Sequence, residues 1–553
     1  MQPTLPTRRT AVRFRPDRAI RGMRATLARV VRRAAIVLVA AGFLFAAGCS
    51  GSEASAPPTR HAGSSAPSTQ TSATTGVQAV TGARPGSWEV TTKLLDDPYI
   101  QPPAPVSPTT NVSRAGCVGA PERRPLVGEG ILSLTLSAPQ TDWSNAIDTS
   151  VVVDVSVDRG TSQQIVLFDG AEPFAYEGFI GKTSGGSHCV TIALRRDLSH
   201  TALDHPGVDV YSIGLSLVPA SSSAYLLETH APVLYGRSIS AKGDTPLVTY
   251  GQSKADPDGT ATDLSYTVIW THEDMGDGSV PPYEWGRWGR VSDIETVLNE
   301  RVSPAGRVLS ADYLSCGCEA IPGYPDSAID RSAAGGETYK PYPLSGGAPG
   351  LDDHLAIRDA TGNNDVSPYG TTPYRFQQSL VAAPGPGQSR EVAMDNNPWS
   401  YRVSGQEVSR EATSSTDPRS LLAGVYPQYL VVDIEAAAEG TSSIAVEVQI
   451  AGDPSWYSND YAQATAPAAP TTYPFFNGGH RRTVIKLPVG WHGKAITALR
   501  LRLNARAGAA PSLVGTPAID LIEVSPSYTT SHPSFPPPIV VTGTTRYPAA
   551  ATP

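Results

Sequence analysis

Short runs of alternating apolar and polar residues recur along most of this chain. In the first half, the alternation predicts five strands, at residues 130–138, 150–157, 164–168, 189–194 and 208–217. Turn residues separate them, and Asp158-Arg159-Gly160 predicts a hairpin turn. Short strands at this spacing are typical of an antiparallel β-sandwich.

A second set of alternating runs lies near the C-terminus, at residues 429–435, 443–450, 482–487, 495–504 and 518–524. Within LRLRLN, the period of two places Leu499, Leu501 and Leu503 on one face of a strand. This pattern predicts a second sandwich or jelly roll. By pattern it is similar to the galactose-binding-like sandwiches often attached to secreted enzymes.

The segment between these sets has a different character. Residues 266–270 read as a strand that ends at Trp270. Residues 291–302 predict a short helix, with Ser292 as its N-cap and Glu295 as the capping-box partner. Residues 303–420 are rich in Pro-Gly pairs and polar clusters, which predicts a long irregular segment.

Composition agrees with a mainly β fold. Charged residues make up only 17% of the chain, while it has 51 Gly and 50 Pro, as expected for many strands joined by turns. We therefore predict two or three antiparallel sandwich or jelly-roll units with a loop-rich insertion. The expected divisions are a signal peptide (1–48), a lipidated Cys and Ser/Thr/Pro-rich linker (49–85), a β-sandwich (86–223), a β unit (224–302), the insertion (303–420), a jelly-roll-like domain (421–530) and a tail (531–553).

The N-terminus predicts export. Three arginines precede an apolar run from Ala34 to Ala47, which has the length of a signal-peptide core and is too short to span a bilayer. The run ends in Ala46-Ala47-Gly48-Cys49, which resembles the lipobox of bacterial lipoproteins, with Ala46 where Leu is usual. The resemblance implies that Cys49 is lipidated and holds the protein on the outer face of the cell membrane, or on an outer membrane or in the periplasm. An ordinary signal peptide with a chance Cys is the alternative.

Charge argues against nucleic acid as a partner. Residues 1–48 hold ten Arg and one Asp, so the remaining chain carries a net charge of −17. An acidic body lacks the cations that neutralise phosphates. The membrane, through the lipid anchor, and a glycan or other cell-wall component are the expected partners.

Export also permits disulfide bonds. With Cys49 lipidated, four cysteines remain, and we predict a bond between Cys117 and Cys189. Cys316 and Cys318 would then close a very small ring or stay reduced.

Residues 266–295 combine more charge and aromatic side chains than any other stretch. The ligand-binding candidates are His272, Glu273, Asp274, Asp277, Trp285, Arg287, Trp288, Arg290 and Asp293. Carboxylates at short spacing suit a hard cation or a polar ligand, and arginines beside tryptophans suit an anion or a polyol. The alternative is a solvated acidic turn whose arginines only pair with its acids.

A second oxygen-rich loop lies at Asp359, Asn363 and Asp365, which have the side chains that Ca²⁺ prefers. A plain Asx-turn cluster explains the same residues. Calcium is thus the one cofactor that the sequence suggests. Catalytic residues are not identifiable from the sequence, because paired carboxylates do acid-base work only at a particular separation.

Three blocks, HAPVLYGR, YTVIWTHED and WGRWGRVSDIE, are similar to a family of uncharacterised secreted bacterial proteins. The similarity covers residues 228–302 and implies no activity. The sequence therefore predicts an envelope protein that binds a glycan or another polar envelope component. The alternatives are a secreted glycan-acting hydrolase with a C-terminal binding module, and a purely structural envelope protein.

If Cys49 carries the lipid, Cys49→Ala should move the protein from the membrane fraction to the soluble fraction, because the attachment site is lost. Cell fractionation with an antibody against the chain measures this. Unchanged membrane association of the variant would rule out the lipoprotein prediction.

Overall fold

The structure is a computed structural model. It describes residues 99–100, 113–119, 127–143, 149–184, 187–203, 206–237, 245–272, 288–315, 338–361, 364–403, 406, 429–459, 478–505, 509–525, 529–536 and 540–544. All of these residues belong to one unit of the chain. The predicted mainly β fold is confirmed, with 55% of the described residues in strands and 6% in helices.

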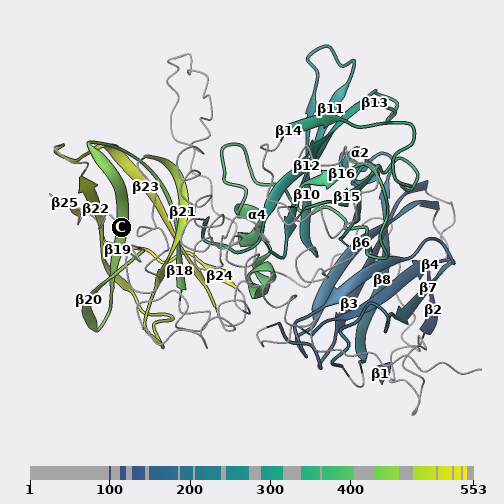
Figure 1. The fold of residues 1–553 in the computed structure, drawn as a ribbon, viewed down its shortest axis with the longest axis horizontal. Helices are drawn as coiled ribbons and strands as arrows, with labels where there is room; N and C mark the ends of the chain where they lie inside the picture. Colours follow the sequence, from purple (N-terminus) through teal and green to yellow (C-terminus); the bar gives the residue numbers. More distant parts are fainter. Residues whose placement is uncertain are drawn as a thin grey trace, which may run out of the picture. The chain divides into compact units, whose positions relative to one another are not determined.

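The first strands form the predicted sandwich. One sheet has the order β1-β8-β3-β6 and the other β2-β7-β4-β5, and Figure 1 shows β3, β6 and β8 side by side. The strands are β1 (Tyr99–Ile100), β2 (Ser113–Gly119), β3 (Val127–Ser137), β4 (Val151–Val157), β5 (Gln163–Leu167), β6 (Phe174–Ser184), β7 (Ser187–Leu194) and β8 (Val208–Pro219). Alternate residues of both sheets meet in one apolar core, which includes Leu132, Val153 and Ile192. The predicted hairpin turn is present, since Asp158 and Arg159 both have positive φ.

The central strands form two further sheets. A five-stranded antiparallel sheet has the order β10-β11-β12-β13-β14, and a smaller one has the order β16-β15-β9-β17, in which β15 and β9 are parallel. The strands are β9 (Val233–Tyr235), β10 (Pro246–Ala255), β11 (Thr262–Trp270), β12 (Ile294–Val302), β13 (Val308–Ser315), β14 (Thr338–Pro341), β15 (Ala356–Asp359), β16 (Val366–Ser367) and β17 (Arg375–Phe376). Tyr266 and Trp270 are fully buried in their core.

The C-terminal strands form a second sandwich. Its sheets have the orders β21-β18-β23-β24 and β20-β19-β22-β25. The strands are β18 (Tyr429–Glu439), β19 (Thr441–Ile450), β20 (Asp453–Ser458), β21 (Gly478–Lys486), β22 (Ile496–Ala505), β23 (Ser512–Val524), β24 (Thr530–Ser531) and β25 (Val540–Thr544). Leu499, Leu501 and Leu503 lie together in its core, which confirms the alternation in LRLRLN.

The helices of the described residues are short: α2 (Tyr225–Thr229), α4 (Val392–Asp395) and the 3-10 helix η3 (Pro398–Ser400). Within the described ranges, no helix has the length and apolar character needed to cross a membrane.

The predicted helix at residues 291–302 is wrong, because Ile294–Val302 is strand β12. Ser292 is fully buried, and its hydroxyl lies 3.5 Å from the sulfur of Met394. Strand β12 pairs with β11 on one side and β13 on the other. The backbone hydrogen bonds to both neighbouring strands stabilise β12 more than a capping box would stabilise a helix, because a capping box satisfies only donors at the helix end.

The expected boundaries at residues 303 and 531 do not mark changes of structure. Strands β13 and β14 extend the sheet of β10–β12, and β15–β17 pair around β9. Residues 540–544, expected in a tail, form β25 and pair with β22 in parallel. The described strands of the segment expected as a loop-rich insertion are thus built into the central sheets.

The sandwich register bears on the predicted disulfide. Cys117 in β2 lies directly opposite Cys189 in β7. Residues opposite one another in an antiparallel pair have Cα atoms about 4.5–5.5 Å apart, which is within the range of about 4.4–6.8 Å for disulfides. Cys316 and Cys318 lie outside the described residues.

We therefore expect peptide mapping without reduction to recover one fragment that joins the Cys117 and Cys189 peptides, and reduction to separate them. In the chain-entropy model such a bond contributes about 4 kcal/mol, because it closes a long loop in the unfolded chain. Alkylation of both thiols in the unreduced, unfolded protein would contradict the prediction.

Candidate functional site

A pocket of about 610 Å³ opens where the first sandwich meets the central sheets. Strand β6 supplies Glu177, helix α2 supplies Glu228, and the segment 379–383 forms another wall. Helix α2 also supplies Leu227, and the remaining wall comes from the end of β8, the loop before α2, and β10, with Leu217, Val218, Pro219, Ser222, Ala224 and Gly251. We take this pocket as the candidate functional site and call it the Glu228 pocket.

The segment 377–381 holds the two sides of the pocket together. Its backbone follows β6, where Phe179 N donates to Gln377 O at 2.9 Å and Ser379 N donates to Glu177 O at 3.0 Å. It then reaches β10, where Val381 N donates to Thr249 O at 2.9 Å. Backbone bonds to two strands fix this wall more firmly than a free loop would allow.

Glu228 is the most perturbed acid of the pocket. Its side chain is almost fully buried, and it accepts hydrogen bonds from the Ser379 hydroxyl at 3.4 Å and from Leu380 N at 3.3 Å. Burial raises the pKa of Glu228 to about 7, and the carboxylates of Glu129 and Glu177 raise it further, against these two hydrogen bonds. Glu228 is therefore close to half-protonated at neutral pH.

Glu177 is the second acid of the pocket and is exposed. One of its oxygens accepts a hydrogen bond from the Ser133 hydroxyl at 3.3 Å. Within the described part of the chain, no Lys, Arg or His pairs with Glu177 or Glu228. The pocket thus combines two carboxylates and presents no cation to neutralise them.

Two buried histidine–carboxylate pairs lie beside α2. His230 Nδ1 is 2.8 Å from Glu300 Oε2, and His230 Nε2 is 2.9 Å from the carbonyl oxygen of Gly306. His354 Nε2 is 3.5 Å from Glu129 Oε1, and its Nδ1 is 2.7 Å from the carbonyl oxygen of Ala231.

All four side chains of these pairs are at most 1% exposed. Burial raises the pKa of Glu300, although His230 opposes the rise. The pairs anchor the residues that follow α2 to β12 and β3, and so they hold Glu228 at the pocket wall.

The structure brings the two stretches singled out in the sequence together, but away from this pocket. Asn364 Nδ2 donates to the carbonyl oxygen of His272 and to Asp293 Oδ2, both at 2.9 Å. Trp270 N donates to Asp293 O at 2.8 Å, so the end of β11 lies beside the start of β12. The predicted candidates Glu273, Asp274, Asp277, Trp285, Arg287 and Asn363 lie outside the described residues.

The proposed calcium loop contains a cation of its own. Arg237 Nε lies 3.9 Å from Asp359 Oδ2, and the Thr361 hydroxyl donates to Asp365 Oδ2 at 3.3 Å. Among the described residues, no group of three or more His, Cys, Asp or Glu is placed to hold a metal ion. The guanidinium and hydroxyl favour the Asx-turn interpretation of this loop.

Arg290 pairs with an acid that the sequence did not suggest. Its Nε is 3.3 Å from Glu391 Oε1, and its guanidinium lies 5.1 Å from the centre of the Trp288 ring. Burial alone would raise the pKa of Glu391, but Arg290, Arg482 and Arg390 hold it at about 2. A carboxylate so stabilised in its charged form is a structural partner of these arginines.

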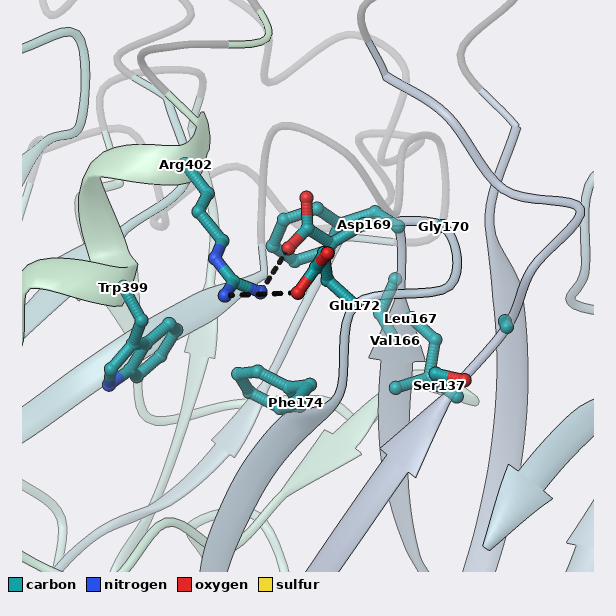
Figure 2. Close-up of a pocket in the computed structure, with 11 residues that line it drawn as sticks. Ser137, Val166, Leu167, Asp169, Gly170, Glu172, Phe174, Trp399 and Arg402 are labelled. Atoms are coloured by element: carbon teal, nitrogen blue, oxygen red, sulfur yellow. Dashed lines mark hydrogen bonds and ion pairs between the residues drawn. The ribbon is translucent and has the colours of Figure 1, made fainter. Parts of the chain in front are cut away.

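Figure 2 shows a second, smaller hollow, in which Arg402 points toward Asp169 and Glu172 beside Trp399 and Phe174. Arg402 forms an ion pair with Asp169, and its Nη2 is 4.0 Å from Glu172 Oε2. Burial raises the pKa of Asp169 to about 6, although Arg402 opposes the rise. The free space is about 10 Å³, room for about one water molecule. This hollow is therefore a packed polar contact.

Sequence reasoning did not identify the Glu228 pocket. Its acids lie in β6 and α2, 51 positions apart, without a motif. The nearest signal is the block HAPVLYGR, which begins at His230, two positions after Glu228. No family model matches the chain, and no curated protein is significantly similar to it.

The pKa of Glu228 gives a stability prediction. Because its pKa is raised in the folded state, Glu228 contributes stability below about pH 4.5, and this contribution is lost as the pH rises through about 7. Glu228→Gln lacks the ionisation. As the pH rises from 5 to 8.5, the free energy of unfolding of the variant should thus increase by about 3 kcal/mol relative to that of the wild type.

Urea unfolding at both pH values measures this change. The control is Glu439→Gln at an exposed position in the C-terminal sandwich. Its free energy of unfolding relative to the wild type should be the same at both pH values. A difference between Glu228→Gln and wild type that does not vary with pH would contradict the shifted pKa.

Proposed function

We propose that this chain is an exported, lipid-anchored envelope protein that binds a polar envelope component, such as a glycan, in the Glu228 pocket. The observation that carries the proposal is the pocket itself, which has two carboxylates and two serines within an otherwise apolar wall. Ligand sites typically combine a mostly apolar concave surface with a few convergent polar groups. The lipobox resemblance at Cys49 supplies the expected location.

The position of the pocket also supports binding. Its walls belong to strands and to a backbone-bonded segment, and the two histidine–carboxylate pairs hold α2 from behind. A rigid site loses little conformational freedom when a ligand enters. Such a site suits recognition of one envelope component.

A glycan-acting hydrolase is the second candidate, and one observation favours it. Glu228 holds a proton near neutral pH, as a general acid must, and a second carboxylate, that of Glu177, lines the same pocket. Glycoside hydrolysis generally uses two such carboxyl groups. In this reading Glu228 donates a proton to the leaving oxygen, while Glu177 acts on the opposite side.

The test uses the full chain and soluble glycan fragments released from purified cell walls. We expect saturable binding in calorimetry, and at least a tenfold loss of affinity in Ala382→Trp, which places an indole at an exposed position of the pocket wall. Val489→Trp, at an exposed site in the C-terminal sandwich, is the matched control. Equal affinity of Ala382→Trp and wild type would reject the pocket as the binding site.

The same fragments separate binding from hydrolysis. A hydrolase would release new reducing ends, and Glu228→Gln would abolish the release. A binding protein would leave the fragments intact in wild type and variant alike.

A further inference from the structure

The side chains that line the Glu228 pocket are chemically one-sided. Its charged groups are Glu177 and Glu228, its hydroxyls are Ser222 and Ser379, and the other lining residues are aliphatic, proline or glycine. The described lining includes no Lys, Arg, His or aromatic residue. Such a surface repels anions and lacks a ring on which a sugar face could stack.

In the described part of the chain, Glu228 also lacks a counter-charge. A carboxylate this deeply buried normally has a cationic partner, because an isolated buried charge is costly. The nearby histidines are engaged elsewhere, His230 with Glu300 and His354 with Glu129. The two hydrogen bonds from Ser379 and Leu380 are long, at 3.3–3.4 Å.

Among the described residues, no Lys, Arg or His supplies this charge, and the lining indicates what kind of ligand could supply it. We propose that the Glu228 pocket binds a ligand through a primary ammonium group carried on a short aliphatic stem. The ammonium lies between the carboxylates of Glu228 and Glu177, and the stem packs on Leu217, Leu227 and Leu380. This assignment rests on the proposed function, because it names the ligand chemistry of the same pocket.

The three N–H donors of an ammonium group match three hydrogen-bond acceptors of this pocket. Both carboxylates and the Ser379 hydroxyl can accept hydrogen bonds from it, and a charged donor shortens and strengthens each bond. The aliphatic wall removes the stem from water, at roughly 0.8 kcal/mol for each buried methylene group. An alcohol of the same length would still gain from the burial of its stem, but it would lose the charge-assisted hydrogen bonds.

Binding of an ammonium group is coupled to a proton. A primary amine stays charged well above neutral pH, as lysine does, whereas Glu228 must lose its proton to bind it. Because the pKa of Glu228 is about 7, the binding-competent fraction at pH 5.5 is about one thirtieth of that at pH 8.5. Affinity should therefore rise about 30-fold over this interval, with close to one proton released for each ligand at the lower pH.

The experiment titrates the full chain with n-butylamine in calorimetry at pH 5.5 and pH 8.5, in two buffers of different ionisation enthalpy that report the protons released. n-Butanol and butyrate are the matched probes without the cation. We expect saturable binding of butylamine alone, about 30-fold tighter at the higher pH. The variant Ala382→Trp should lose it at least tenfold.

Variants at the carboxylates complete the test. Glu228→Gln should weaken butylamine binding at least tenfold at pH 8.5 and remove its pH dependence, and Glu439→Gln should change neither. Butanol binding as tightly as butylamine, or butylamine affinity that is unchanged in Glu228→Gln, would overturn the ammonium assignment. Glycan fragments that bind an Ala382→Trp-sensitive site while butylamine does not would reject this assignment and leave the proposed function standing.

Discussion

The ion pair between His230 and Glu300 is the contact on which the arrangement around the pocket depends. His230 follows α2 directly, Glu300 lies in β12, and Gly306 in the next turn accepts from the other ring nitrogen. One imidazole thus joins three segments. Removal of one partner from such a buried pair leaves the other side chain buried without its hydrogen bond, which costs about 1–3 kcal/mol. Helix α2 has only five residues, and this pair supplies positional stability that so short a helix lacks.

The second pair, His354 with Glu129, extends the same principle to the first sandwich. Glu129 lies in β3 and also accepts from Gly181 N at 2.8 Å, while His354 stacks on Phe179 with ring centres 4.0 Å apart. The first sandwich and the central sheets therefore share polar contacts as well as apolar core. The pocket forms at this junction, where residues 377–381 bond to β6 of the first sandwich and to β10 of the central sheet. Helix α2 lines the same pocket. Glu228 is buried there as a result of the packing, and among the described residues it lacks the histidine partner that Glu129 and Glu300 have.

The stretch that dominates the sequence, residues 266–295, contributes most visibly to the core and to polar contacts. Trp270 and Ile294 are fully buried, Asp293 is bridged through Asn364 to the backbone of His272, and Arg290 pairs with Glu391. Among the described residues of this stretch, Arg290 and Asp293 are buried and have polar partners, as buried ions require. The sequence alternative pairs these arginines with acids of the same stretch, whereas Glu391, which pairs with Arg290, is 101 positions away.

Local pattern determined most of the secondary structure. A period of two needs no knowledge of distant residues, so ten strands of the two sandwiches, the turn at Asp158 and the buried face of Leu499, Leu501 and Leu503 were predictable. The other described strands of the sandwiches, β1, β2, β6, β20, β24 and β25, were not predicted. Residues 291–302 were not predictable, because the two strands that flank β12 overrode a capping signal. The Glu228 pocket was decided only by tertiary structure. The burial of Glu228 and its place beside Glu177 in one pocket depend on where separate sheets meet, and a sequence carries no local signal for that.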